Sequence, residues 1–366
     1  MPQLLTSRQD DTRRLVNDAH YAVVVGINFY QHLQDLGGPV NDAAQFCEWL
    51  VDEDGGGLPA ENVRPVKATE ERDGEDLIPT LGDIHQTLNY VNLEMNARLD
   101  RDPGVFERSR LYVFVAGHGM SAPKTSVALF STEAVQGMWG KALDVQACGQ
   151  WYVDYGPFAE VVLLADCCRT RYHDVSVEDV PFDKSTTKRG RPRPVLVTGF
   201  ATLPDELAFE AAAAIAPDEK RGYFSQALLD AVREEIDPDS GYVTSLSLAK
   251  GIRTRVEAMT APPCPAPQTS QMQGPLETPV IFGPRRDHLR PVTIRVSAEK
   301  ARRYGTLELL TGDSKFVARC PVERAGSTWR LDLRPGLYRL RWVNTDGTVR
   351  KGPNVDTDEP SEDVDA

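Results

Sequence analysis

Three continuous apolar runs constrain the fold of this chain more than any other feature of its sequence. They are Tyr21–Ile27 (YAVVVGI), Leu111–Ala116 (LYVFVA) and Val161–Ala165 (VVLLA). Short runs that are apolar at every position are typical of strands buried on both faces of a parallel sheet. Between the first two runs, apolar residues recur at helical spacing: Leu81, Ile84, Leu88, Val91 and Met95. That spacing predicts an amphipathic helix between two buried strands.

The same alternation continues through the first 280 residues. The sequence predicts a short strand near 63–66, a further strand from Val195, and helices over Phe224–Ile236 and Ser247–Met259. Strands that alternate with helices indicate an α/β domain with a mostly parallel sheet flanked by helices. The segment 260–278 carries so many prolines that we expect a loop there.

After Pro284 the pattern changes to short alternating segments separated by turn signals, such as VTIRVS, TLELLT and LYRLRWV. This pattern favours a small all-β sandwich. We therefore expect an N-terminal extension over 1–19, an α/β domain over 20–284, a β-sandwich over 285–353 and an acidic, disordered tail over 354–366.

Composition limits the classes of function. The six cysteines form no CxxC pair and no dense framework, so neither a zinc site nor a disulfide scaffold is indicated. The net charge of −13 argues against nonspecific nucleic-acid binding, which depends on Lys and Arg. No apolar run is long enough to span a membrane, and the N-terminus lacks the apolar core of a signal peptide. We expect a cytoplasmic protein.

Two of the buried strands end in reactive side chains. Leu111–Ala116 leads into His118, which lies between two glycines, and Val161–Ala165 leads into Cys168. Catalytic groups of open α/β sheets gather beyond the carboxyl ends of the strands, and a thiol needs a nearby base to become a thiolate near pH 7. Taken singly, the histidine could be an ordinary polar residue and the cysteine a small buried one. Together they indicate a Cys-His pair.

Four blocks of the sequence resemble the caspase and metacaspase superfamily of cysteine peptidases. They are AVVVGINFY with LGGPVNDA, FVAGHG, LLADCCR and RGYFSQALLDAV, and they span roughly residues 20–283. His118 precedes Cys168 by fifty residues, in line with the caspase separation. The resemblance covers the expected α/β domain and leaves the C-terminal segments unexplained.

The resemblance implies a mechanism in which Cys168 attacks the scissile carbonyl and His118 transfers protons. The oxyanion is expected to meet the backbone N–H groups of Gly119 and Cys168. The spacing of the family's Asp-x-Cys block assigns the nucleophile to Cys168, and Cys167 is then a packing residue. No metal or other cofactor is implied.

Asp42 and Asp166 occupy the positions that hold a basic side chain in metacaspase-like relatives. The resemblance therefore implies cleavage after Arg or Lys, because two clustered carboxylates suit a guanidinium. Asp42 could instead be a helix N-cap.

The segment 170–194 is polar and rich in charge. Caspase-like enzymes often mature by cleavage after the catalytic cysteine, and the candidate cleavage positions here are Lys184, Lys188, Arg189 and Arg191. The alternative is a solvated basic loop that is never cut. Four nearby acids suggest calcium activation as a further possibility: Asp174, Glu178, Asp179 and Asp183.

The expected partners are protein or peptide substrates and an upstream activating protease, with no nucleic acid and no membrane. By analogy with bacterial caspase-like proteins, the pathway would be stress response, cell death or antiviral defence. Two other functions stay open: a CHAT- or separase-type cysteine protease, and a catalytically silent scaffold with a caspase fold.

Overall fold

The chain was analysed as a computed structural model of all 366 residues. The structure describes residues 17–69, 77–122, 125–135, 137, 139–173, 175, 177–178, 180–184, 191–212, 220–238, 240–262, 264, 266–286, 290–304, 306–320, 327–333, 336–344, 346–357 and 363–365. The chain divides into two compact units. The first comprises Met1–Glu235 with Val243–Pro284, and the second comprises Ile236–Tyr242 with Arg285–Ala366.

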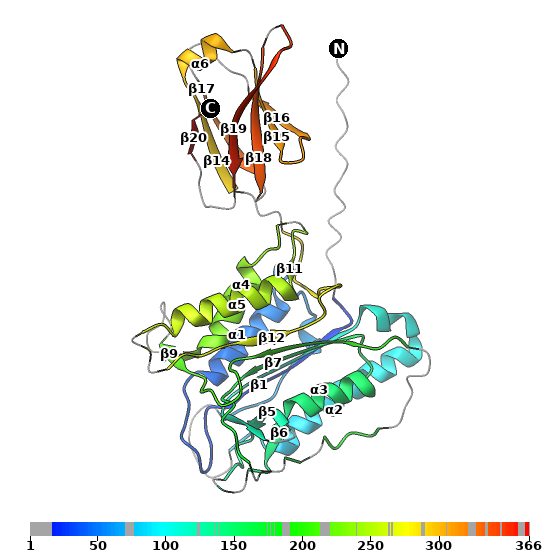
Figure 1. Ribbon diagram of the computed structural model, residues 1–366. Coiled ribbons are helices and arrows are strands. Elements are labelled where there is room, and N and C mark those ends of the chain that lie inside the picture. Colours follow the sequence, from blue (N-terminus) through cyan, green and yellow to red (C-terminus); the bar gives the residue numbers. More distant parts are fainter. Residues whose placement is uncertain are drawn as a thin grey trace. The chain divides into compact units, whose positions relative to one another are not determined.

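A six-stranded sheet forms the centre of the first unit (Figure 1). In spatial order its strands are β12 (Gln271–Gln273), β8 (Val195–Phe200), β7 (Glu160–Asp166), β3 (Arg110–Ala116), β1 (His20–Gly26) and β2 (Val63–Pro65). All neighbours are parallel except β12, which runs antiparallel to β8. The mostly parallel sheet predicted from the apolar runs is confirmed, and β3 is buried at every position.

Helices cover both faces of this sheet. Figure 1 shows α1 (Pro39–Val51), α4 (Tyr223–Glu234) and α5 (Ser245–Met259) on one face, with α2 (Leu81–Arg101) and α3 (Val145–Asp154) on the other. The five residues that predicted α2 are all buried in it, together with Leu99, which follows Met95 by one turn on the same face. The helix begins at a capping box in which Thr80 and Asp83 satisfy each other's backbone N–H groups.

Shorter elements accompany the central sheet. A three-stranded sheet contains β4 (Gly119–Ala122), β5 (Thr125–Phe130) and β6 (Ala142–Asp144). Two small pairs are β9 (Glu210–Ala212) with β10 (Lys220–Gly222), and β11 (Val243–Thr244) with β13 (Ile281–Phe282). Two 3₁₀ helices complete the unit: Ala60–Asn62 and Pro103–Arg108.

The prediction that 260–278 is entirely loop is wrong at one place. Gln271–Gln273 forms β12, which extends the sheet beyond β8. These three residues contain no proline, so their backbone N–H groups can join the ladder, and an edge strand tolerates prolines just outside it.

The second unit contains two sheets. One has the order β17 (Ser327–Leu333), β14 (Arg290–Val296), β20 (Asp363–Asp365), and the other β16 (Phe316–Cys320), β15 (Thr306–Thr311), β18 (Leu337–Val343), β19 (Val349–Asp356). A six-residue helix, α6 (Ala298–Arg303), follows β14. Residues from both sheets share one apolar core, for example Ile294, Leu309 and Trp342. The sheets therefore form a small sandwich.

The expectation of a disordered tail over 354–366 differs from the structure. Residues 354–356 belong to β19, and Asp363–Asp365 forms β20 in parallel pairing with β14. The composition of the tail suggested disorder because it buries little apolar surface. Pairing with a sheet edge supplies backbone hydrogen bonds that composition does not reveal.

Candidate active site

The sheet register brings His118 and Cys168 to equivalent positions. Strands β3 and β7 are parallel neighbours, with Ala116 paired to Asp166, and the Gly117 amide donates to the Asp166 carbonyl at 3.1 Å. His118 and Cys168 each follow two residues after these paired strand ends. Because neighbouring strands lie about 4.8 Å apart, these two residues, fifty positions apart in sequence, lie close together at the carboxyl end of the sheet.

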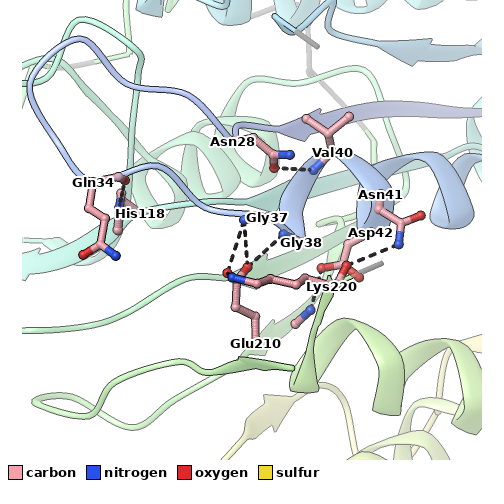
Figure 2. Close-up of polar contacts among 11 residues, drawn as sticks. Asn28, Gln34, Gly37, Gly38, Val40, Asn41, Asp42, His118, Glu210 and Lys220 are labelled. Carbon is pink, nitrogen blue, oxygen red and sulfur yellow. Dashed lines mark hydrogen bonds and ion pairs between the residues drawn. The ribbon is translucent and has the colours of Figure 1, made fainter. Parts of the chain in front are cut away.

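The His118 ring is oriented by two contacts. Its Nε2 lies 2.7 Å from the Gln34 carbonyl oxygen (Figure 2), and its face packs on the Tyr30 ring at 4.9 Å. The His118 amide also donates to the buried Tyr30 hydroxyl at 2.8 Å. A carbonyl oxygen only accepts hydrogen bonds, so Nε2 carries a proton. In the neutral ring, Nδ1 is then the basic nitrogen.

Burial lowers the pKa of His118, although the Gln34 carbonyl and the acids Glu210 and Asp35 oppose the shift. The imidazole is therefore neutral near pH 7 and can accept a proton. A neutral histidine is the form that a thiol requires as its base.

The Cys168 thiol is half-buried and contacts the backbone of Ala208. The Ala208 amide donates to Sγ at 3.3 Å, and Sγ lies 3.8 Å from the Ala208 carbonyl oxygen. Burial raises the pKa of the Cys168 thiol, while the Ala208 amide lowers it. Among the described residues, no hydrogen bond joins Sγ to the His118 ring. The thiol thus depends on a base to reach the thiolate form.

Cys167, next to Cys168 in sequence, is buried. Its side chain is 1% exposed and belongs to the main apolar core. A β-carbon built at Gly119 would lie 2.7 Å from Cys167 Sγ and 2.7 Å from the Ala128 carbonyl oxygen. Position 119 therefore has room only for glycine, because a buried sulfur and a backbone oxygen occupy the space.

We expect Gly119→Ala to destabilise the fold, since neither neighbour of the added methyl group can retreat freely. Overpacking of this kind costs roughly 1–3 kcal/mol. Denaturant unfolding of the variant measures the loss. Gly82→Ala is the control, because nothing but the Thr80 hydroxyl at 3.5 Å approaches that site in α2. Equal midpoints for the two variants would contradict the packing argument.

The carboxylates of Asp42 and Asp166 come together beside Gly222. A β-carbon at Gly222 would lie 2.2 Å from Asp166 Oδ2 and 3.1 Å from Asp42 Oδ2. Asp42 accepts from the Gly222 amide at 2.8 Å, and Asp166 accepts from the Ser225 amide at 2.9 Å and hydroxyl at 2.6 Å. Gly38, not Asp42, is the N-cap of α1, so the N-cap alternative for Asp42 is wrong.

Both carboxylates are buried, at 1% and 7% exposure. Burial raises the pKa of Asp42, and the neighbouring charge of Asp166 raises it further. Burial likewise raises the pKa of Asp166, while its hydrogen bonds from Ser225 oppose the shift. The two groups therefore hold protons more tightly than an ordinary aspartate does.

No sequence motif indicated two further residues of this cluster. Glu210, in β9, accepts from the amides of Gly37 at 3.2 Å and Gly38 at 2.8 Å, at the start of α1 (Figure 2). Its charge also raises the pKa values of both Asp166 and His118. The Arg221 guanidinium, 9% exposed, contacts Asp42 through Nε at 3.2 Å. Only the folding of the β9–β10 pair onto α1 places them here.

The other predicted site residues are less fully described. Lys184 is exposed, and the Arg191 guanidinium lies 5.4 Å from the centre of the Phe106 ring, whereas Lys188 and Arg189 lie outside the described residues. Of the acids considered for calcium, Glu178 pairs with Lys141 at 3.3 Å and Asp183 is exposed. Asp174 and Asp179 lie outside the described residues.

Among the described residues, no group of three or more His, Cys, Asp or Glu side chains is arranged to hold a metal ion. No helix in the same part of the chain has the length and apolarity needed to cross a membrane.

Comparisons with known proteins found relatives and solved structures similar to parts of this chain. A probable protease of a Desulfuromonadales bacterium is 25% identical over 226 residues, which is 58% of this chain and 26% of that protein. The chain thus matches only about a quarter of that relative's length. Caspase-1 of Spodoptera frugiperda is 13% identical over 79% of this chain and all of the solved chain, with a TM-score of 0.47. Its pro-form is 14% identical over 74% of this chain and 97% of the other, with a TM-score of 0.43.

The family model of the caspase domain matches residues 19–277, well over half of the chain. That range contains the whole parallel sheet with His118 and Cys168 at its carboxyl edge. The chain belongs to the caspase-domain family of cysteine peptidases.

Proposed function

We propose that the chain is an endopeptidase that uses a Cys168–His118 dyad and cleaves peptides after Arg or Lys. The observation that supports this function best is the shared register of the two residues beyond β3 and β7, with an acidic cluster beside them. A nucleophile, a neutral base and a cation-binding pocket are the parts that such a reaction needs.

In the proposed reaction, His118 Nδ1 takes the proton from Cys168 Sγ, and the thiolate attacks the scissile carbonyl carbon. The Gly119 and Cys168 amides stabilise the oxyanion. The imidazolium then gives its proton to the leaving amine, which departs and leaves a thioester. Water, deprotonated by His118, hydrolyses the thioester and restores the thiol. The Gln34 carbonyl keeps Nε2 protonated throughout, so that Nδ1 faces the reacting groups.

The preference for basic residues rests on the charges around Gly222. Three carboxylates gather there, namely Asp42, Asp166 and Glu210, against the cations Arg221 and Lys220. The cluster therefore keeps one net negative charge when all its members are ionised. A single guanidinium or ammonium of the substrate would neutralise it.

We propose further that cleavage after Lys184, Lys188, Arg189 or Arg191 activates the enzyme, by its own action or that of another protease. The exposure of Lys184 and the basic character of the segment support this. Calcium activation, a cytoplasmic location and a role in stress, cell death or defence extend the proposal by analogy.

A panel of fluorogenic peptides ending in Arg, Lys or Asp tests this function. The full chain is assayed with and without calcium, and with and without trypsin pretreatment that a serine-protease inhibitor stops before the peptides are added. We expect cleavage of the Arg and Lys peptides alone. Cleavage after Asp would support a protease but contradict the proposed roles of Asp42 and Asp166 in binding a basic side chain. No cleavage under any condition would favour the scaffold alternative.

Binding of basic ligands should depend on pH. Burial raises the pKa of Asp42 to about 8 and that of Asp166 to about 6, so both lose charge as the pH falls from 8 to 6. A protonated carboxyl group attracts a guanidinium only weakly. We expect an arginine-terminated peptide amide to bind Cys168→Ala about tenfold more weakly at pH 6 than at pH 8, measured by calorimetry.

The same shifts have the opposite effect on folding. An unfolded aspartate has an ordinary, lower pKa, so between about pH 4 and 8 these two groups bind more protons in the folded chain than in the unfolded chain. The contribution of these two groups to stability therefore falls as the pH rises through their raised pKa values. Asp166→Asn should flatten this part of the stability profile. An unchanged slope would contradict the buried, proton-retaining state of Asp166.

A further inference from the structure

The last strand of the chain occupies the edge of a sheet in the second unit. β20 pairs in parallel with β14, and the register joins Thr293 to Asp363, Ile294 to Val364 and Arg295 to Asp365. In that sheet β14 lies between β17 and β20. Without β20, one side of β14 would present unpaired backbone N–H and C=O groups. Asp363–Asp365 therefore acts as an added strand on an edge of β14 that would otherwise be open.

Charge is distributed unevenly between this strand and the rest of the unit. Residues 285–357 contain sixteen Lys and Arg against eight Asp and Glu, whereas residues 358–366 contain five acids and no cation. On β14, exposed Arg295 is the register partner of Asp365. On β17, exposed Arg330 is the register partner of Thr293 of β14. The sequence thus places an acidic segment in register with a strand that carries basic residues and no acid, and opposite charges on neighbouring strands favour pairing.

The pairing is short enough to be exchangeable. It comprises three residue pairs, so few backbone hydrogen bonds hold it. Recognition by strand addition works through the same bonds, with affinity supplied by the backbone and selectivity by the side chains.

We propose that the β14 edge is a recognition site for an extended acidic peptide segment of a partner protein, and that Asp363–Asp365 fills this site when no partner is bound. The site is separate from the proposed peptidase chemistry and does not depend on it. The partner segment would need alternating acidic residues around an apolar one, as in the chain's own Asp363-Val364-Asp365.

Fluorescence anisotropy with a labelled peptide of the sequence 357–366 (TDEPSEDVDA) tests the proposal. The full chain carrying Val364→Pro is the receptor, since proline removes the N–H of the middle residue of β20 and releases the edge. We expect the peptide to bind this variant at least tenfold more tightly than the unmodified chain, whose own tail competes. A peptide with Lys in place of its five acids should not bind.

Matched charge reversals locate the site. In the Val364→Pro chain, Arg295→Glu should weaken binding about tenfold, while Lys315→Glu, an equal charge change at an exposed residue between β15 and β16 of the other sheet, should leave it within twofold. Equal effects would indicate general electrostatic attraction and overturn the site. If the unmodified chain forms a dimer and the peptide dissociates it, the β14 edge binds a second copy of the chain. That result would contradict the proposal of a different partner protein.

A second measurement applies to the unmodified chain and does not require the proline variant to fold. In hydrogen exchange, excess peptide should expose the amides of residues 363–365 while those of 292–296 remain protected, because one strand replaces another. Unchanged protection at 363–365 under saturating peptide would refute exchange at this edge.

Discussion

Cys168→Ala should reduce kcat/KM for arginine peptides by about 10⁴-fold or more, because removal of a nucleophile leaves only binding and oxyanion stabilisation. The thiol lies at the sheet edge beside the position of His118 and contacts the Ala208 amide, so no other described sulfur can take its place. Purified variant and parent chain would be compared on the same fluorogenic peptide after the same activation.

The neighbouring thiol supplies the control. Cys167→Ala removes a sulfur that is 1% exposed and packed in the core. We expect a stability loss of roughly 1 kcal/mol and a rate within about tenfold of the parent. An inactive Cys167→Ala beside an active Cys168→Ala would reverse the assignment of the nucleophile.

Asp166→Asn should reduce kcat/KM for Arg and Lys peptides by about 10²-fold, mainly through KM. The substitution neutralises the Asp166 carboxylate, which is expected to pair with the basic side chain of the substrate. Loss of one partner of a buried charge pair costs about 2–5 kcal/mol in comparable interfaces. The amide oxygen of Asn can still accept from the Ser225 amide and hydroxyl, so the local geometry should persist. Steady-state kinetics on peptides that differ only in the residue before the cut measure the effect.

Asp144→Asn is the matched control for that variant. Asp144 is also buried, at 9% exposure, but it caps α3 by accepting from the Ala147 amide at 2.8 Å. Asn is as good an N-cap as Asp, so we expect unchanged kinetics. A similar loss in both variants would show that Asp166 acts through stability and not through substrate charge.

Much of the first unit could be read from local patterns. A run such as Leu111–Ala116 is apolar at every position, which is typical of a strand in a sheet covered on both faces. The apolar residues of α2 recur at helical spacing and therefore lie on one face of the helix. Two predictions failed where pairing, not composition, decides structure. β12 lies in a proline-rich segment and β20 in an acidic tail, and both form because a neighbouring strand offers backbone partners.

The sequence by itself determined the alternation of strands and helices and the sandwich after Pro284, because these follow from local periodicity. The motifs at two strand ends indicated His118 and Cys168, and the resemblance to the caspase superfamily added Asp42 and Asp166. Tertiary structure alone decided that Gln34 orients His118, that Ala208 contacts Cys168, and that Glu210 and Arg221 join the acidic cluster. These contacts join residues 40 to 179 positions apart, and no local pattern records which distant backbone group a folded loop will present.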